Sequence, residues 1–245
     1  MAAHGAGQAA RLSFAFACVA LTFATRSEAS DAWGGSLAVT TDYVYRGLSQ
    51  SGGEPAIQGG LYAQPATGWT IGVWASTVQL GRNADTSAEV DLYLARSWAM
   101  GSDWDARVGL THYAYPNDNL PLQYDYDELI ASVSYRQRVT ATATWSPKMS
   151  RYGAGRVARD REAASYELTY LQPVIGAWSF GAGAGYYDLE DLFDTGYWYW
   201  NAGFLYSWQR LQVDLAYIDA DHTVYRLYGY RAGGGRWSAA LTWRF

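Results

Sequence analysis

Short segments of period-two alternation recur from residue 36 to the C-terminus, and they constrain the fold more than any other feature of the chain. Residues 139–145, Val-Thr-Ala-Thr-Ala-Thr-Trp, carry threonine at every second position, and the last ten residues alternate large apolar with small or polar side chains. Successive side chains of a strand point to opposite faces, so the pattern predicts strands with one apolar and one polar face. The twelve predicted strands are 36–46, 56–64, 69–78, 88–98, 104–115, 126–136, 139–146, 164–172, 178–187, 197–208, 211–219 and 236–245.

The connections between these strands alternate between short and long. The short ones are Pro65–Gly68, Ala99–Asp103, Gln137-Arg138, Pro173–Ala177 and Gln209-Arg210, and the long ones lie around 47–55, 79–87, 116–125, 147–163, 188–196 and 220–235. Outer-membrane barrels have short periplasmic turns, longer outer loops and an even number of strands, each of about nine to eleven residues. The sequence therefore predicts an all-β fold, a transmembrane antiparallel up-and-down β-barrel of about 12 strands. A soluble β-sandwich or lipocalin-like barrel with an aromatic core is the alternative.

Aromatic residues support the membrane barrel, because the chain has 12 Trp and 21 Tyr and such barrels place these residues in belts at both lipid–water interfaces. Near the short connections lie Trp69, Trp98, Trp104, Trp178, Trp208, Trp243 and Phe245, and near the long ones lie Tyr43, Tyr45, Tyr115, Trp145, Tyr186, Trp198 and Tyr217. Most share parity with the aliphatic positions of their strands. We therefore expect two aromatic belts on the lipid-facing surface.

The N-terminal residues have the pattern of a cleaved signal peptide. Arg11 precedes an apolar run over 12–23, and Ser27-Glu28-Ala29 is a plausible cleavage site. The run is too short for a transmembrane anchor, and lipoprotein processing at Cys18 is disfavoured because the apolar run continues past it. We predict a signal peptide over 1–29, a barrel over 30–245 and export to the bacterial outer membrane.

If the aliphatic positions face lipid, the opposite parity lines the interior, since an Arg or Lys facing lipid at the midplane costs about 2–4 kcal/mol. The predicted channel-lining residues are Asp42, Arg46, Glu89, Asp91, Asp105, Arg107, Glu128, Glu167, Asp214 and Arg244, with Gln58, Tyr62, Gln64, Arg136 and Gln212. Acids outnumber arginines in this set. The pattern predicts a porin-like channel for small hydrophilic solutes or ions with a mild preference for cations.

The alternative is a filled interior, in which opposite charges pair and the barrel is structural or adhesive. Gly181, Gly183 and Gly185 share one interior stripe and leave room there, for example for an inserted loop. The loop 147–163 is basic and the loop 188–196 is acidic. The basic loop is expected either to constrict the channel or to hold lipopolysaccharide phosphates, or else the two loops pair with each other.

An outer-membrane hydrolase is a further alternative, because Asp219-Ala220-Asp221-His222 lies in the last long loop and a carboxylate can orient a histidine base. The only other histidine beyond the predicted signal peptide is His112, which we expect at the membrane interface. Since no serine or second carboxylate pair stands in a recognisable context, we predict that the protein is not an enzyme. No metal-ligand cluster, cofactor motif or basic stripe for nucleic acid is present in the sequence.

The first hairpin carries a resemblance to a known family. Asp42-Tyr43-Val44-Tyr45-Arg46-Gly47-Leu48-Ser49-Gln50-Ser51, followed by Glu54–Gly60, resembles the TorF family of proteobacterial outer-membrane proteins, of the Gcw_chp type, and so does Ala88–Tyr93. The resemblance implies a barrel with pore activity, but no substrate and no binding residues. The closing Trp243-Arg244-Phe245 resembles the C-terminal aromatic signal of outer-membrane proteins, which implies that Phe245 is read by the outer-membrane insertion machinery.

Overall fold

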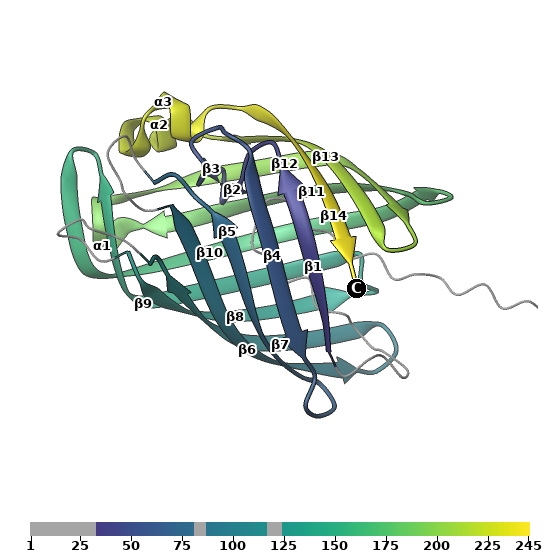
Figure 1. Cartoon of the computed structure of the whole chain (residues 1–245). Coiled ribbons are helices and arrows are strands. Elements are labelled where there is room, and N and C mark those ends of the chain that lie inside the picture. The colour runs from purple at the N-terminus through teal and green to yellow at the C-terminus, as the bar shows by residue number, and fades with distance from the viewer. Residues whose placement is uncertain (1–32, 81–86, 117–123) are drawn as a thin grey trace, which may run out of the picture.

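A computed structural model of the chain describes residues 33–80, 87–116 and 124–245 (Figure 1). Twelve strands form one closed antiparallel barrel in the order β1-β14-β13-β12-β11-β10-β9-β8-β7-β6-β5-β4. They are β1 (Trp33–Thr40), β4 (Ala56–Ala63), β5 (Trp69–Thr77), β6 (Ala88–Met100), β7 (Trp104–Ala114), β8 (Tyr126–Tyr135), β9 (Val139–Gly153), β10 (Arg156–Ile175), β11 (Trp178–Leu189), β12 (Thr195–Trp208), β13 (Leu211–Ala220) and β14 (Arg236–Arg244). The predicted barrel and its strand number are confirmed.

The barrel closes where its first and last strands meet. β1 pairs with β14 as well as with β4, and the seam is extended by two hydrogen bonds between Gly35 and Phe245, at 2.9 and 3.0 Å. An open sheet edge in hydrocarbon would leave backbone N–H and C=O groups unpaired at several kcal/mol each. Closure removes this cost for every strand.

Two predicted boundaries are wrong. The first predicted strand, 36–46, ends as β1 at Thr40, and the chain then forms a small hairpin of β2 (Val44–Tyr45) and β3 (Leu48–Ser49). The turn between them places Arg46 and Gly47 at φ values of 50° and 75°, as two-residue hairpin turns require. Alternation alone does not reveal such a turn.

The second error concerns residues 147–163, which were predicted as a long loop. β9 and β10 instead continue through this range and join at a tight turn, with Ala154 at φ 49° and Gly155 at φ 73°. The two strands project beyond the rest of the barrel at the long-loop end (Figure 1).

Three short helices lie in two of the other long connections, 188–196 and 220–235. These are α1 (Glu190–Phe193), α2 (His222–Tyr228) and α3 (Tyr230–Gly233), all at the end opposite the short turns (Figure 1). None of the helices in the described part of the chain is long and apolar enough to cross a membrane. The predicted signal peptide, 1–29, lies outside the described residues, as do parts of the predicted loops 79–87 and 116–125.

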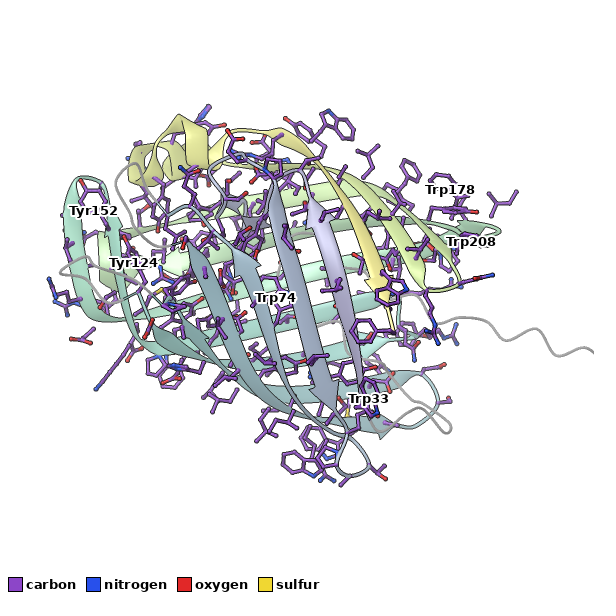
Figure 2. All side chains as sticks on the ribbon, in the orientation of Figure 1. Trp33, Trp74, Tyr124, Tyr152, Trp178 and Trp208 are labelled. Atoms are coloured by element: carbon purple, nitrogen blue, oxygen red, sulfur yellow. The ribbon has the colours of Figure 1, made fainter. Side chains whose placement is uncertain are left out.

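The outer surface of the barrel is apolar. Leu61, Ile71, Leu94 and Leu110 are exposed on neighbouring strands around its middle. Tryptophans gather at the short-turn end, where Trp33, Trp178 and Trp208 point outward (Figure 2). A soluble barrel would bury these side chains, so the soluble alternative is wrong.

The predicted aromatic belts need one correction. Exposed belt residues include Trp98, Trp104, Trp178, Trp208 and Trp243 at the short-turn end, and Trp145, Trp198 and Tyr217 at the other. Tyr43 and Tyr115, however, are buried, and Tyr45 is partly buried. These three tyrosines belong to the interior, because the chain turns into the barrel after β1 and because Tyr115 follows the end of β7.

Candidate functional site inside the barrel

The interior differs between its two halves. Near the short turns of β8, β9 and β10, small polar side chains alternate with exposed apolar ones and remain partly exposed themselves; they are Ser132, Ser134, Thr140, Thr142 and Thr169. In a closed barrel these alternate positions face inward. Solvent therefore reaches the interior along these three strands, whereas Ser179, Gln212 and Asp214 on other strands are buried.

The long-loop half is packed with aromatic side chains. Many of its buried residues form one cluster with members from the strands and from α1 and α2: Tyr113, Tyr115, Tyr126, Met149, Ala158, Ala163, Tyr187, Leu189, Leu192, Phe193, Tyr197, Tyr199, Ala220, Val224 and Leu227. Val224 and Leu227 are the buried residues of α2. This packing fills interior space toward the outer end.

A segment between β1 and β4 lies within this half. We call residues 41–55 the plug segment; it contains the β2–β3 hairpin, and its residues Asp42, Val44, Arg46, Ser49 and Ser51 are all buried. Since β1 and β4 are neighbours in the barrel, the connection needs no such length. The segment instead fills the space between walls that lie far apart in the sequence.

Arg46 attaches the plug segment to β8 and β9. Its Nη2 donates to Glu128 Oε2 at 2.8 Å and to Thr144 Oγ1 at 2.9 Å, and both side chains of the ion pair are at most 4% exposed. The guanidinium also lies over the rings of Tyr45 and Tyr187, at 4.5 and 4.7 Å from the centroids. An Arg side chain stays charged in proteins, so this is a buried ion pair.

Glu128 has further donors. Thr144 Oγ1 and Ser146 Oγ donate to its Oε2 at 3.2 and 3.4 Å, and the Tyr45 and Tyr113 hydroxyls donate to its Oε1 at 3.3 and 3.4 Å. A buried carboxylate is tolerated only with such pairing. The barrel wall is thus organised around the Glu128 charge.

Asp42 attaches the other end of the plug segment to β14. Arg236 Nη1 donates to Asp42 Oδ2 at 2.7 Å, and the Ser49 and Ser51 hydroxyls donate to Oδ1 at 2.6 and 2.9 Å. The two serines hold the hairpin to Asp42 while Arg236 holds Asp42 to the wall. The plug segment is therefore tied to β8 and to β14 by separate ion pairs.

Two acids near the plug segment are less well paired than Glu128 and Asp42. Glu89 accepts a hydrogen bond from the Tyr43 hydroxyl at 3.3 Å and lies close enough to Arg151 to interact with its charge, while its Oε2 is buried without a hydrogen-bond partner in the described part of the chain. Asp91 is 0% exposed, and neither of its carboxylate oxygens has such a partner. Glu89 and Glu128 are close enough to repel a charge on Asp91.

The remaining predicted interior residues are less enclosed or differently paired. Asp105, Arg107, Glu167 and Arg244 are partly buried. Arg107 donates to Ser97 and Glu167 accepts from the Tyr199 hydroxyl, while buried Asp214 accepts two bonds from Gln212 Nε2, at 2.8 and 2.9 Å. Asp105, Arg107, Asp214 and Arg244 lie toward the short turns, whereas Glu89, Asp91 and Glu128 lie near the plug segment.

Sequence reasoning did not identify several members of this arrangement. Thr144 stands in the threonine series that predicted β9, and its parity would have placed it inside. Arg236 begins the last strand, and no sequence signal connects it to Asp42. An inserted loop was one expectation for the space beside the glycines of β11. At Gly185 this space is filled by the Tyr199 ring from β12.

The two charged long loops contact each other. Arg156 pairs with Asp194 at 2.7 Å, and Glu162 N donates to Asp191 Oδ2 at 3.3 Å, so the pairing alternative holds for these contacts. Arg151 turns inward over Tyr124 and Tyr126, while Lys148 and Arg161 are exposed. His112 pairs with Asp127 at 2.8 Å on the outer surface, and Asp221 accepts from Thr223 N as the N-cap of α2.

Comparisons with known proteins agree with this architecture. The model of a family described as "Bacterial protein of unknown function (Gcw_chp)" matches residues 26–243, and no curated protein matches the chain. A solved KdgM porin is 7% identical with a TM-score of 0.53, covering 86% of this chain and 99% of that one. A NanC porin is 12% identical with a TM-score of 0.55, covering 86% and 98%. At such identities the likeness shows the fold, which is that of outer-membrane porins. Together with the apolar exterior, it places the barrel in the bacterial outer membrane.

Proposed function

Because the chain belongs to the Gcw_chp family of bacterial proteins of unknown function, its role has to be argued from its own barrel, and we propose that it is a porin-like channel. It would pass small hydrophilic solutes or ions by passive diffusion, with a mild preference for cations. The narrower assignment to the TorF group is part of this proposal and rests on the first hairpin.

One observation carries the proposal: the barrel is apolar outside and polar inside, and solvent reaches the inner face. A barrel that served only as a rigid anchor would need no hydrated interior. Ser132, Thr140 and Thr169 offer hydroxyl groups to a passing solute while bringing no charge of their own. Such a surface suits diffusion without tight binding.

The preference for cations rests on the interior charges. Arg46 and Arg236 each pair with one acid and Arg151 lies near Glu89, whereas both oxygens of Asp91 have no partner among the described side chains. Acids and arginines are more evenly matched near the short turns, where Asp105 and Asp214 lie with Arg107 and Arg244. An excess of carboxylates favours cations in a pore.

The packed outer half supports a second candidate, a filled barrel with a structural role. The plug segment and the buried cluster of the long-loop half occupy the path from the outer end. Under the channel proposal, conduction requires the plug segment to move. Under the structural alternative it never moves, and the barrel does not conduct.

The hydrolase alternative gains no supporting geometry from the described residues. Asp221, the nearest carboxylate in the sequence to His222, accepts hydrogen bonds from Thr223 N and from Trp198 N. It therefore holds α2 and β12 together. We propose no catalytic residue, no cofactor and no metal.

The partners that we propose follow from the location. Outer-membrane lipid surrounds the apolar belt, and the exposed Lys148 and Arg161 lie at the outer end, where they can approach lipopolysaccharide phosphates. Phe245 completes the barrel seam, which is consistent with its proposed recognition by the insertion machinery.

Single-channel recording of the refolded protein in a planar bilayer tests the channel proposal. We expect stepwise openings and, in a salt gradient, a reversal potential that favours cations. Neutralising Glu89, Asp91 and Asp105 together should reduce that preference. Correctly folded protein that never conducts, even when the plug segment is removed, would refute the channel and leave the structural role.

A further inference from the structure

The wall around Glu128 has the components of a binding site for a planar organic cation. Glu128 on β8 supplies a carboxylate, Thr144 on β9 supplies a hydroxyl, and Tyr187 on β11 supplies an aromatic face. Guanidinium groups bind carboxylates in a planar arrangement and stack on aromatic rings. The three groups lie on three barrel strands and do not belong to the plug segment.

Arg46 occupies this site as part of the chain itself, and it does so incompletely. Its Nη2 makes both hydrogen bonds, whereas Nη1 is buried without a hydrogen-bond partner in the described part of the chain. Leaving a buried donor unpaired has a cost in free energy. The backbone of the hairpin fixes how far the Arg46 side chain can reach, and a free ligand has no such restriction.

The wall also offers more acceptors than Arg46 uses. Both oxygens of Asp91 are buried without a hydrogen-bond partner among the described residues, and Asp91 is the cross-strand neighbour of Tyr113, whose hydroxyl contacts Glu128. Three acids, Glu89, Asp91 and Glu128, thus lie in one region, where Arg46 pairs with Glu128 and the Arg151 guanidinium lies close enough to act on Glu89. The unused oxygens of Asp91 are acceptors for a ligand that carries several N–H donors.

We propose that the Glu128 site recognises organic cations of the guanidinium class, and that Arg46 closes the channel by occupying this site. The inference rests on the proposed channel function and names the solute class for it. An arriving guanidinium group competes with Arg46 for Glu128 and Tyr187. Displacement of Arg46 frees the hairpin from β8, while the Asp42–Arg236 pair still holds its other end to β14.

The test is rescue of an Arg46→Ala variant by guanidinium ion in detergent micelles, which needs no conduction. Loss of the buried ion pair should lower the thermal midpoint of the folded barrel by roughly 10 °C. Millimolar guanidinium chloride should restore at least half of that shift, with saturation. Sodium chloride at the same ionic strength should not.

Two controls make the result specific. In the double variant Arg46→Ala/Glu128→Gln the carboxylate is gone, so guanidinium should have no effect. In Arg46→Lys the site is already occupied by a cation, so the response should be much smaller. If Arg46→Ala refolds only in the presence of guanidinium, recovery of the folded, heat-modifiable band is the equivalent supporting result.

Failure of this inference is distinguishable from failure of the channel proposal. If guanidinium changes neither the midpoint nor the folding yield of Arg46→Ala, or acts equally on the double variant, the site assignment is wrong, whatever the bilayer recordings show. If guanidinium rescues the variant but no form of the protein conducts, the site stands as a binding site and the channel is refuted.

Discussion

At the scale of single residues, the buried ion pair of the plug segment is the contact whose loss should cost most. Glu128→Gln leaves the Arg46 charge buried without its counter-ion, and breaking such a pair destabilises a protein by about 3–5 kcal/mol. The free energy of unfolding, measured by denaturant titration in lipid vesicles, should fall by this amount.

The adjacent Asp127 provides a matched control for Glu128→Gln. Its pair with His112 lies on the outer surface with both side chains well exposed, and exposed pairs contribute about 0–1 kcal/mol. Asp127→Asn should therefore change stability little. Equal losses for the two variants would show that the Glu128 site is not the anchor inferred from the structure.

The space beside the glycines of β11 gives a second prediction at the scale of single residues. A Cβ at Gly185 would collide with the Tyr199 ring and would lie 2.9 Å from the Tyr166 carbonyl oxygen, whereas a Cβ at Gly183 meets Asn201 and Thr169 side-chain atoms at 3.2–3.3 Å. Gly185→Ala should lower the free energy of unfolding by about 1–3 kcal/mol, as overpacked positions do. Gly183→Ala, on the same face of the same strand, should cost less. A larger loss for Gly183→Ala than for Gly185→Ala would show that the Tyr199 ring can move away from Gly185 without cost.

At the scale of elements, the strands were predictable and the plug segment was not. The alternation of β5, β7 and β13 has the same period in the sequence and in the barrel, because lipid on one side and water on the other act on successive residues. Residues 41–46 continue that alternation, yet they leave the wall. What decides their position is the turn at Arg46-Gly47 and contacts with β8 and β14, which lie 82 and 194 residues away at their ion pairs.

The β9–β10 hairpin shows the opposite case, in which strands continue where the sequence does not alternate. Its outer part carries Lys148, Arg156 and Arg159 and lacks apolar alternation, because beyond the membrane no lipid selects one face. Pairing between the two strands nevertheless continues past the membrane. Strand length therefore could not be predicted from the amphipathic pattern, whereas strand position in the membrane could.

Removal of the plug segment tests its role as an element. Replacing residues 43–51 with a short Gly-Ser linker should leave the barrel closed, since β1 and β4 pair directly. We expect larger and longer-lived conductance steps than in the unaltered protein. A control is Asp127→Asn, whose pair with His112 lies on the outer surface, and it should leave conductance unchanged. If the folded barrel without the plug segment does not conduct, the buried cluster of the long-loop half blocks the path by itself.

At the scale of the whole molecule, inside and outside could be predicted from parity, but the state of the interior could not. Parity assigned Glu89, Asp91 and Glu128 to the inner face, and the structure buries all three. Whether that face meets water or packed side chains depends on the plug segment and on α2. The first residues of the plug segment continue the strand alternation and α2 has none, so alternation does not place either of them. Fold is thus more predictable here than permeability.

The same division between inside and outside can be tested with one charge placed on either surface. Leu94 faces lipid near the middle of β6, and Ser132 faces the solvent-accessible interior from β8. Leu94→Arg should lower the free energy of unfolding in vesicles by about 2–4 kcal/mol, the cost of an arginine facing lipid at the midplane. Ser132→Arg keeps its charge in water and should cost less, while adding a positive charge to the path and so weakening the cation preference. Similar losses for both variants would mean that the inner face near the short turns is not hydrated, and the channel would lose the observation on which it rests.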